Sequence, residues 1–145
     1  MEELIQKKNI EVNIDVDNWE DAIKSVGNLL MNSKQIEDGY VNSMINSVKE
    51  LGPYIVLSQG FALAHAAPNT ETVHKPSLAI VTLKKPVKFG SPNDPVKVLM
   101  CLACMDKATH LDLLSKAAKK LMQENFVENA AKCKTVDELY HVIND

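Results

Sequence analysis

Histidine is the residue type in this chain best suited to nucleophilic, acid–base or metal chemistry near neutral pH. His65 closes a short apolar run that begins at Gly60, and a loop-like sequence with Pro68 and Asn69 follows it. An apolar run before a turn signal is typical of a strand that enters a loop, which would place His65 at the edge of a sheet. That position suits a nucleophile, a general base or a metal ligand. The alternative is a purely structural histidine among small residues.

His110 is the second candidate. It follows a strongly apolar stretch, residues 96–105, at a point where a helix is expected to begin. Ligand sites in α/β sheets gather beyond strand ends, and helix N-termini attract anions. If the two strand ends are neighbours, His65 and His110 converge on one site suited to phosphate chemistry; otherwise His110 only occupies a first helical turn. We expect His74 in a solvated loop and His141 on the surface of the last helix or in its packing.

The pair Cys101 and Cys104 has the spacing of a redox motif or of half a zinc site. The pair falls on an expected strand, however, where residues i and i+3 point to opposite faces. Cys133 stands alone, and the histidines lack a metal-ligand spacing such as HxxxH. The sequence therefore favours buried cysteines that act as small apolar residues. A thiol or metal protein is the less favoured reading, and we predict no metal site and no cofactor.

Composition limits the class of protein. With 145 residues, of which 46% are hydrophobic, the chain is expected to form a single domain, 1–145. The net charge of -3, without a basic patch, argues against a nucleic-acid partner. No segment approaches the roughly eighteen apolar residues of a spanning helix, and the start lacks the layout of a signal peptide. With three cysteines, these features predict a cytoplasmic protein with reduced thiols and no direct membrane insertion.

All 16 positively charged residues are lysines. Any anion site in this chain must therefore use lysine, histidine, hydroxyl or backbone N–H groups.

Hydrophobic periodicity predicts alternating strands and helices. Residues 10–16 read as a first strand, and Asp17 with Glu20 as the start of a helix. A second helix ends at Gly52-Pro53, and strand-like runs follow at 54–57, 60–65, 78–83 and 96–105, the last one central in the sheet.

The C-terminal part reads as helical. Thr109 is expected to cap a helix, and Thr135 with Glu138 forms a capping box for the last of two further short helices. The helix that starts near Thr109 is expected to bury Leu111, Leu114, Ala117, Ala118 and Leu121. The fold class is α/β, with a central mixed β-sheet of about five strands flanked by α-helices.

Several stretches together resemble the EIIA component of the bacterial phosphoenolpyruvate-dependent sugar phosphotransferase system, of the mannitol/fructose type and nearest its ascorbate-specific branch. The matching stretches are Trp-Glu-Asp-Ala at 19–22, Gly-Pro-Tyr-Ile-Val-Leu at 52–57, Gly-Phe-Ala-Leu-Ala-His at 60–65, Val-Thr-Leu-Lys-Lys-Pro at 81–86, Asn-Asp-Pro-Val at 93–96 and Thr-His at 109–110. They follow one another in order over nearly the whole chain.

This resemblance implies a phosphotransferase component and a role for each candidate residue. His65 would accept a phosphoryl group from the carrier protein HPr, as a tele-phosphohistidine intermediate. The group would then pass to a cysteine of a cognate EIIB, and from there to a sugar imported by the membrane component EIIC. His110 would support the phosphohistidine. Lys49 lies near a position where relatives carry an arginine, which makes it a phosphate-binding candidate; the alternative is a solvated lysine at a helix end.

The chain departs from the family at the site itself. Relatives read Pro-His-Gly, with an arginine next in the ascorbate branch, whereas this chain reads Ala64-His65-Ala66-Ala67. Two functions therefore stay open: a phosphocarrier for uptake of a sugar such as ascorbate, and a regulatory binding module on the same fold that feeds no transporter. The sequence names neither the sugar nor the oligomeric state.

Overall fold

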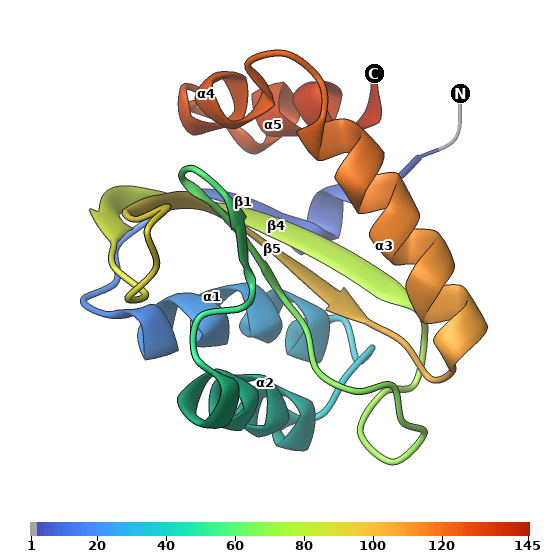
Figure 1. The fold of residues 1–145 in the computed structure, drawn as a ribbon. Coiled ribbons are helices and arrows are strands. Elements are labelled where there is room, and N and C mark those ends of the chain that lie inside the picture. The colour runs from blue at the N-terminus through green and yellow to red at the C-terminus, as the bar shows by residue number, and fades with distance from the viewer. Residues whose placement is uncertain (1–2) are drawn as a thin grey trace.

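The computed structural model describes residues 3–145 (Figure 1). The start of the chain was expected to lack the layout of a signal peptide, and its first two residues lie outside that range. The strands are β1 (Ile10–Ile14), β2 (Val56–Ser58), β3 (Phe61–Ala64), β4 (Ser77–Val87) and β5 (Val96–Ala103). The helices are α1 (Trp19–Asn32), α2 (Asp38–Leu51), α3 (Lys107–Leu121), α4 (Phe126–Ala131) and α5 (Val136–Asn144), with a 3-10 turn at Lys7–Asn9.

The strands form one five-stranded mixed sheet in the order β1-β4-β5-β3-β2. β1 runs parallel to β4 and β3 parallel to β5, while β4 and β5, and likewise β2 and β3, are antiparallel. The predicted α/β class and mixed sheet are confirmed. β5 occupies the middle of the sheet, as predicted, and seven of its eight residues are buried.

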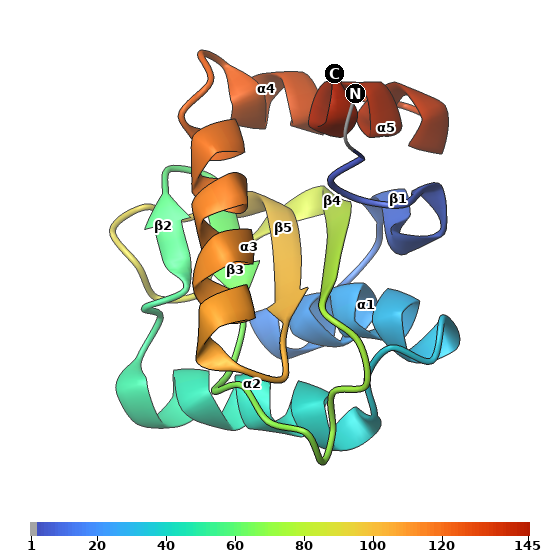
Figure 2. The same ribbon diagram turned by 90° about the vertical axis from the view of Figure 1, so that its right-hand side faces the viewer.

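Helices cover both faces of the sheet (Figures 1 and 2). α1 and α2 enclose one apolar cluster against it, whereas α3, α4 and α5 enclose a second on the opposite face. Cys101 belongs to the first cluster and Cys104 to the second, because side chains three residues apart on an extended segment point to opposite faces. Both thiols are buried and free, as the strand interpretation predicted.

Two helices begin differently from the prediction. The N-cap of α1 is Asn18, not Asp17, because the Asn18 side-chain oxygen reaches the backbone N–H of Asp21 at 2.8 Å. The N-cap of α3 is Asp106, whose carboxylate accepts the backbone N–H of Thr109 at 2.8 Å. Thr109 therefore lies in the first turn of α3 and does not cap it.

The buried face of α3 also differs. Leu111 is 63% exposed, and Ala118, seven residues later on the same side of the helix, is exposed as well. Ala117 is buried, and Leu114 and Leu121 are partly buried against the second cluster. The expectation for Leu111 and Ala118 was wrong because α3 faces the sheet along a narrower stripe than the periodicity indicated.

The remaining boundaries agree with the sequence to within a few residues. Gly52 ends α2 with φ 85°, the left-handed conformation that glycine adopts readily. The capping box of Thr135 and Glu138 is present at α5. Tyr54 precedes β2 and is not part of a strand. In the part of the chain that the structure describes, no helix has the length and apolarity needed to traverse a lipid bilayer.

Candidate functional site

His65 is the first residue after β3. This strand runs parallel to β5, with Ala64 opposite Cys101. Its side chain is partly exposed, and its Nδ1 lies 2.8 Å from the backbone carbonyl oxygen of Leu63. A carbonyl oxygen can only accept a hydrogen bond, so Nδ1 carries the proton. The neutral imidazole therefore has its free lone pair on Nε2, which is the arrangement a nucleophile requires.

Tyr54 supports His65 from one side. Their rings meet edge to face with centroids 5.3 Å apart, and the Tyr54 hydroxyl donates to the backbone carbonyl of His65 at 3.1 Å. Partial burial raises the pKa of the Tyr54 hydroxyl, so it stays protonated as a donor at neutral pH. The sequence placed Tyr54 in a strand and did not identify this contact.

His110 lies on the other side. It belongs to the first turns of α3, and its ring centroid is 5.8 Å from that of His65. Burial, and then the neighbouring His65, lower the pKa of His110, which favours the neutral ring. Its Nδ1 is buried without a hydrogen-bond partner. A buried N–H without an acceptor is costly, so we assign the ring proton to Nε2. The structure thus brings the two predicted histidines together.

Tyr40 fixes the loop that follows His65. This fully buried residue of α2 accepts a hydrogen bond from the backbone N–H of Ala66 at 3.0 Å and donates to the carbonyl of Leu102 at 2.8 Å. Burial raises the pKa of its hydroxyl, which keeps the donor proton in place. Helical spacing alone indicates only that Tyr40 lies on the apolar face of the second helix. Because the hydroxyl joins three separate elements, local pattern could not reveal its role.

The same contact decides which backbone groups of the loop are available. Ala66 N–H donates to the Tyr40 hydroxyl, Pro68 has no N–H, and Asn69 N–H donates to the backbone carbonyl of Cys104 at 3.2 Å. Ala67 N–H forms no hydrogen bond within the described residues and is exposed. Ala66 does not have a positive φ, so alanine at this position, where the family resemblance implies a glycine, causes no left-handed strain.

Lys49 contacts neither histidine. Its Nζ lies 3.6 Å from a carboxylate oxygen of Glu20 on α1; the Lys49 side chain is exposed and that of Glu20 is partly exposed. Exposed lysine pairs of this kind are weak and exchange readily. The phosphate-binding role of Lys49 stays a prediction.

The other two histidines belong to separate contacts. His74 Nε2 lies 2.7 Å from Glu37, and His141 Nδ1 lies 3.1 Å from Asp145. Over residues 3–145 no cluster of three or more histidine, cysteine or acidic side chains has the geometry to hold a metal ion.

Comparison with known proteins identifies the family. The sequence model of the protein family described as phosphoenolpyruvate-dependent sugar phosphotransferase system (PTS), EIIA 2, matches residues 3–145. The chain belongs to this EIIA family. The ascorbate-specific PTS EIIA component of Shigella boydii is 34% identical over 144 residues, which cover 97% of this chain and 92% of that protein.

Solved structures share the fold. In a complex with phosphorylated enzyme IIB, the mannitol enzyme IIA of Escherichia coli has a TM-score of 0.80 at 22% identity, with 96% of each chain covered. The nitrogen regulatory protein IIA-Ntr of Neisseria meningitidis has a TM-score of 0.81 at 24% identity, covering 98% of this chain and 97% of that one.

Proposed function

We propose that this EIIA chain is a phosphoryl carrier in which His65 accepts a phosphoryl group from HPr and passes it to a cognate EIIB. One observation carries the proposal: Nδ1 of His65 is bound by the Leu63 carbonyl, Nε2 forms no hydrogen bond within residues 3–145, and the ring centroid of His110 lies 5.8 Å from that of His65. A histidine fixed in this tautomer needs no base to activate it, because the lone pair is already on the nucleophilic nitrogen.

The transfer then has two steps. The Nε2 lone pair attacks phosphorus, a bond from phosphorus to Nε2 forms, and the bond to the HPr atom that carried the group breaks. In the second step a cysteine thiolate of EIIB attacks, a phosphorus–sulfur bond forms, and the bond to Nε2 breaks. Positioning and charge stabilisation are the main requirements for such transfer.

The phosphoryl oxygens need donors, and the chain has no arginine. We assign this role to the Nε2–H of His110 and to the N–H of Ala67, the unpaired amide next to the site. Both donors are neutral, so they stabilise the phosphoryl group without binding it as tightly as a guanidinium would. A carrier benefits from this balance because the group must leave again.

The surroundings of the site fit protein partners. Leu111, next to His110, is 63% exposed, and Tyr54, against His65, is 38% exposed. Exposed apolar side chains beside a reactive group are typical of a surface that another protein covers. HPr and EIIB would use this surface in turn, because each must bring its own reactive atom to Nε2 of His65.

The ascorbate-specific relatives extend the proposal to the transported compound. We propose that the chain acts as a cytoplasmic phosphotransferase component, with residues 1–145 as one EIIA domain, and that its EIIB and membrane EIIC partners import ascorbate or a related sugar acid. The 34% identity to the Shigella boydii component supports this choice.

The test reconstitutes the relay. The protein is incubated with phosphoenolpyruvate, enzyme I and HPr, and acid-labile phosphate on the chain is measured. We expect wild type and a His74→Ala control to be labelled, and His65→Ala to remain unlabelled. Unlabelled wild type, or equal labelling of His65→Ala, would overturn the proposal. Adding the cognate EIIB then separates the two functions left open by the sequence: discharge indicates transport, whereas retained phosphate indicates a regulatory module.

A further inference from the structure

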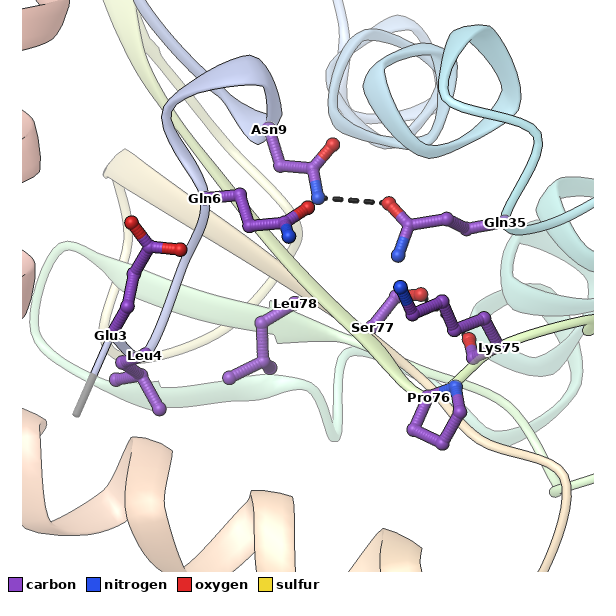
Figure 3. Close-up of a pocket in the computed structure, with 9 residues that line it drawn as sticks. All are labelled: Glu3, Leu4, Gln6, Asn9, Gln35, Lys75, Pro76, Ser77 and Leu78. Atoms are coloured by element: carbon purple, nitrogen blue, oxygen red, sulfur yellow. Dashed lines mark hydrogen bonds between the residues drawn. The ribbon is translucent and has the colours of Figure 1, made fainter.

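A cavity of about 190 Å³ lies where the N-terminal segment, the turn after α1 and the start of β4 meet (Figure 3). Neither His65 nor His110 lines it. Its walls are mostly polar and include Glu3, Gln6, Asn9, Gln35, Lys75 and Ser77. Three of these residues, Asn9, Gln35 and Ser77, are at most 5% exposed. Polar side chains held in place around an open cavity offer preoriented hydrogen-bonding groups to a ligand.

Gln35 is held in one orientation. Its side-chain oxygen accepts hydrogen bonds from Asn9 Nδ2 at 2.9 Å and from the Ser33 hydroxyl at 2.7 Å. The amide nitrogen, Nε2, must then point the other way, and Figure 3 shows it directed into the cavity. Within the described residues Nε2 has no hydrogen-bond partner, although the residue is only 5% exposed. A donor held in one orientation is thus presented to the cavity.

Lys75 adds a positive charge to the same region. Its Nζ forms no ion pair within residues 3–145, and in Figure 3 it lies on the same side of the cavity as Nε2 of Gln35. The hydroxyl of Ser77 donates to the Lys75 backbone carbonyl at 2.6 Å, which fixes the segment that carries the lysine. Two donors, one of them charged, therefore face the same space without a protein acceptor. A carboxylate has two oxygens suited to this arrangement.

The opposite wall carries acceptors. Glu3 is held by a hydrogen bond from the Tyr140 hydroxyl, and the Gln6 amide reaches into the cavity (Figure 3). These groups suit hydroxyls of a ligand, and the carboxylate of Glu3 disfavours a second full negative charge there. The cavity is large enough for about six water molecules, at about 30 Å³ each. That volume corresponds to an acid of three or four carbon atoms.

We propose that this cavity binds a small hydroxycarboxylic acid. Its carboxylate is held by Lys75 Nζ and Gln35 Nε2, and its hydroxyls are bound by Gln6 and Glu3. The site does not overlap the candidate phosphoryl-transfer site, so its test does not depend on the proposed function.

The test follows the side-chain amide signal of Gln35 by ¹⁵N nuclear magnetic resonance while D-glycerate is added to the full chain. Glycerol, which lacks the carboxylate, and inorganic phosphate are titrated in parallel. We expect glycerate to shift the Gln35 amide signal with a Kd of about 1 mM, typical of a small ligand with few contacts. Glycerol should leave it unchanged. Lys75→Gln should weaken glycerate binding about tenfold, the loss expected for one charge-assisted hydrogen bond.

Lys24→Gln is the matched control, because Lys24 is an exposed lysine of α1 that does not line the cavity. It should bind glycerate as wild type does, and Lys75→Gln should still be phosphorylated on His65 at the wild-type rate if the relay operates. Four results would each overturn the proposal: no shift with glycerate, an equal shift with glycerol, equal affinity in Lys75→Gln, or tighter binding of phosphate than of glycerate.

Discussion

The imidazole rings of His65 and His110 lie with their centroids 5.8 Å apart and their planes at 61°. His65 follows a strand and His110 belongs to a helix, yet the two rings are close enough for electrostatic interaction. A change of charge on His65 should therefore alter the protonation of His110. This coupling supplies a measurement that does not require a transport assay.

We expect His110 to titrate below the ordinary histidine value of about 6.5. Burial first, and His65 second, lower its pKa in the folded protein. The unfolded chain then binds more protons as the pH falls from about 6.5 toward the folded pKa. The contribution of His110 to the free energy of unfolding is fully present above pH ~6.5 and is lost as the pH falls through that window. A nuclear magnetic resonance titration checks the midpoint, and a midpoint above 6.5 would contradict the burial argument.

Phosphorylation of His65 should raise the pKa of His110. The phosphoryl group brings negative charge next to the ring, and a nearby opposite charge favours the imidazolium. Titration of the His110 signals in phosphorylated and free protein measures the change. His141 of α5, which is exposed and paired with Asp145, is the internal control, and its signals should not change on phosphorylation. An unchanged His110 midpoint would show that the phosphoryl group does not lie between the two rings.

The phosphoryl group should be attached to Nε2 of His65. The hydrogen bond from Nδ1 to the Leu63 carbonyl, at 2.8 Å, leaves no room for substitution at Nδ1. Nitrogen-15 shifts of the labelled ring distinguish the two isomers. Attachment at Nδ1 would mean that this hydrogen bond breaks before transfer.

Replacing Tyr40 by phenylalanine should destabilise the protein and loosen the loop after His65. The substitution leaves the N–H of Ala66 and the carbonyl of Leu102 without their buried partner, which costs about 1–3 kcal/mol. Chemical denaturation measures the loss, and hydrogen exchange at Ala66 should become faster. Tyr140→Phe is the matched control, because its hydroxyl contacts Glu3 at the surface and should matter by less than about 1 kcal/mol. Equal losses would argue against a special role for Tyr40.

Leu111→Gln should weaken the interaction with HPr and EIIB while leaving stability nearly unchanged. The side chain is 63% exposed beside His110, and loss of its burial in a complex corresponds to about tenfold or more in affinity. The KM of phosphoryl transfer for each partner measures this effect. Met122→Gln, at the other end of α3 and 83% exposed, is the control. If both variants behave alike, the partners do not cover the start of α3.

Lys49→Gln tests the phosphate-binding prediction. Loss of the exposed pair with Glu20 should change the free energy of unfolding by at most about 1 kcal/mol. If the Lys49 side chain turns to the phosphoryl group, acceptance from HPr should slow about tenfold, as expected for one charge-assisted contact. Lys24→Gln provides the comparison for a generic lost lysine. Rates equal to that control would remove Lys49 from the site.

The sequence by itself determined most of the elements and the two candidate histidines. Alternation and helical spacing depend only on neighbouring residues, so they predicted the five strands, the central place of β5 and the opposite faces of Cys101 and Cys104. The family pattern singled out His65 and His110. Helix starts were less certain, because several polar residues near a helix end can compete as the cap, and only the backbone geometry decided for Asn18 and Asp106.

The tertiary structure decided how the two histidines can act. The tautomer of His65 depends on a carbonyl that its own turn presents, the proton of His110 depends on burial by other elements, and the Ala66 amide is fixed by Tyr40 from α2. The polar cavity likewise combines Gln35, Lys75 and the N-terminal segment. Apart from the contact between His65 and Leu63, these contacts join residues far apart in the sequence, and their separation carries no periodic signal. Only the packing of helices on both faces of the sheet brings them together.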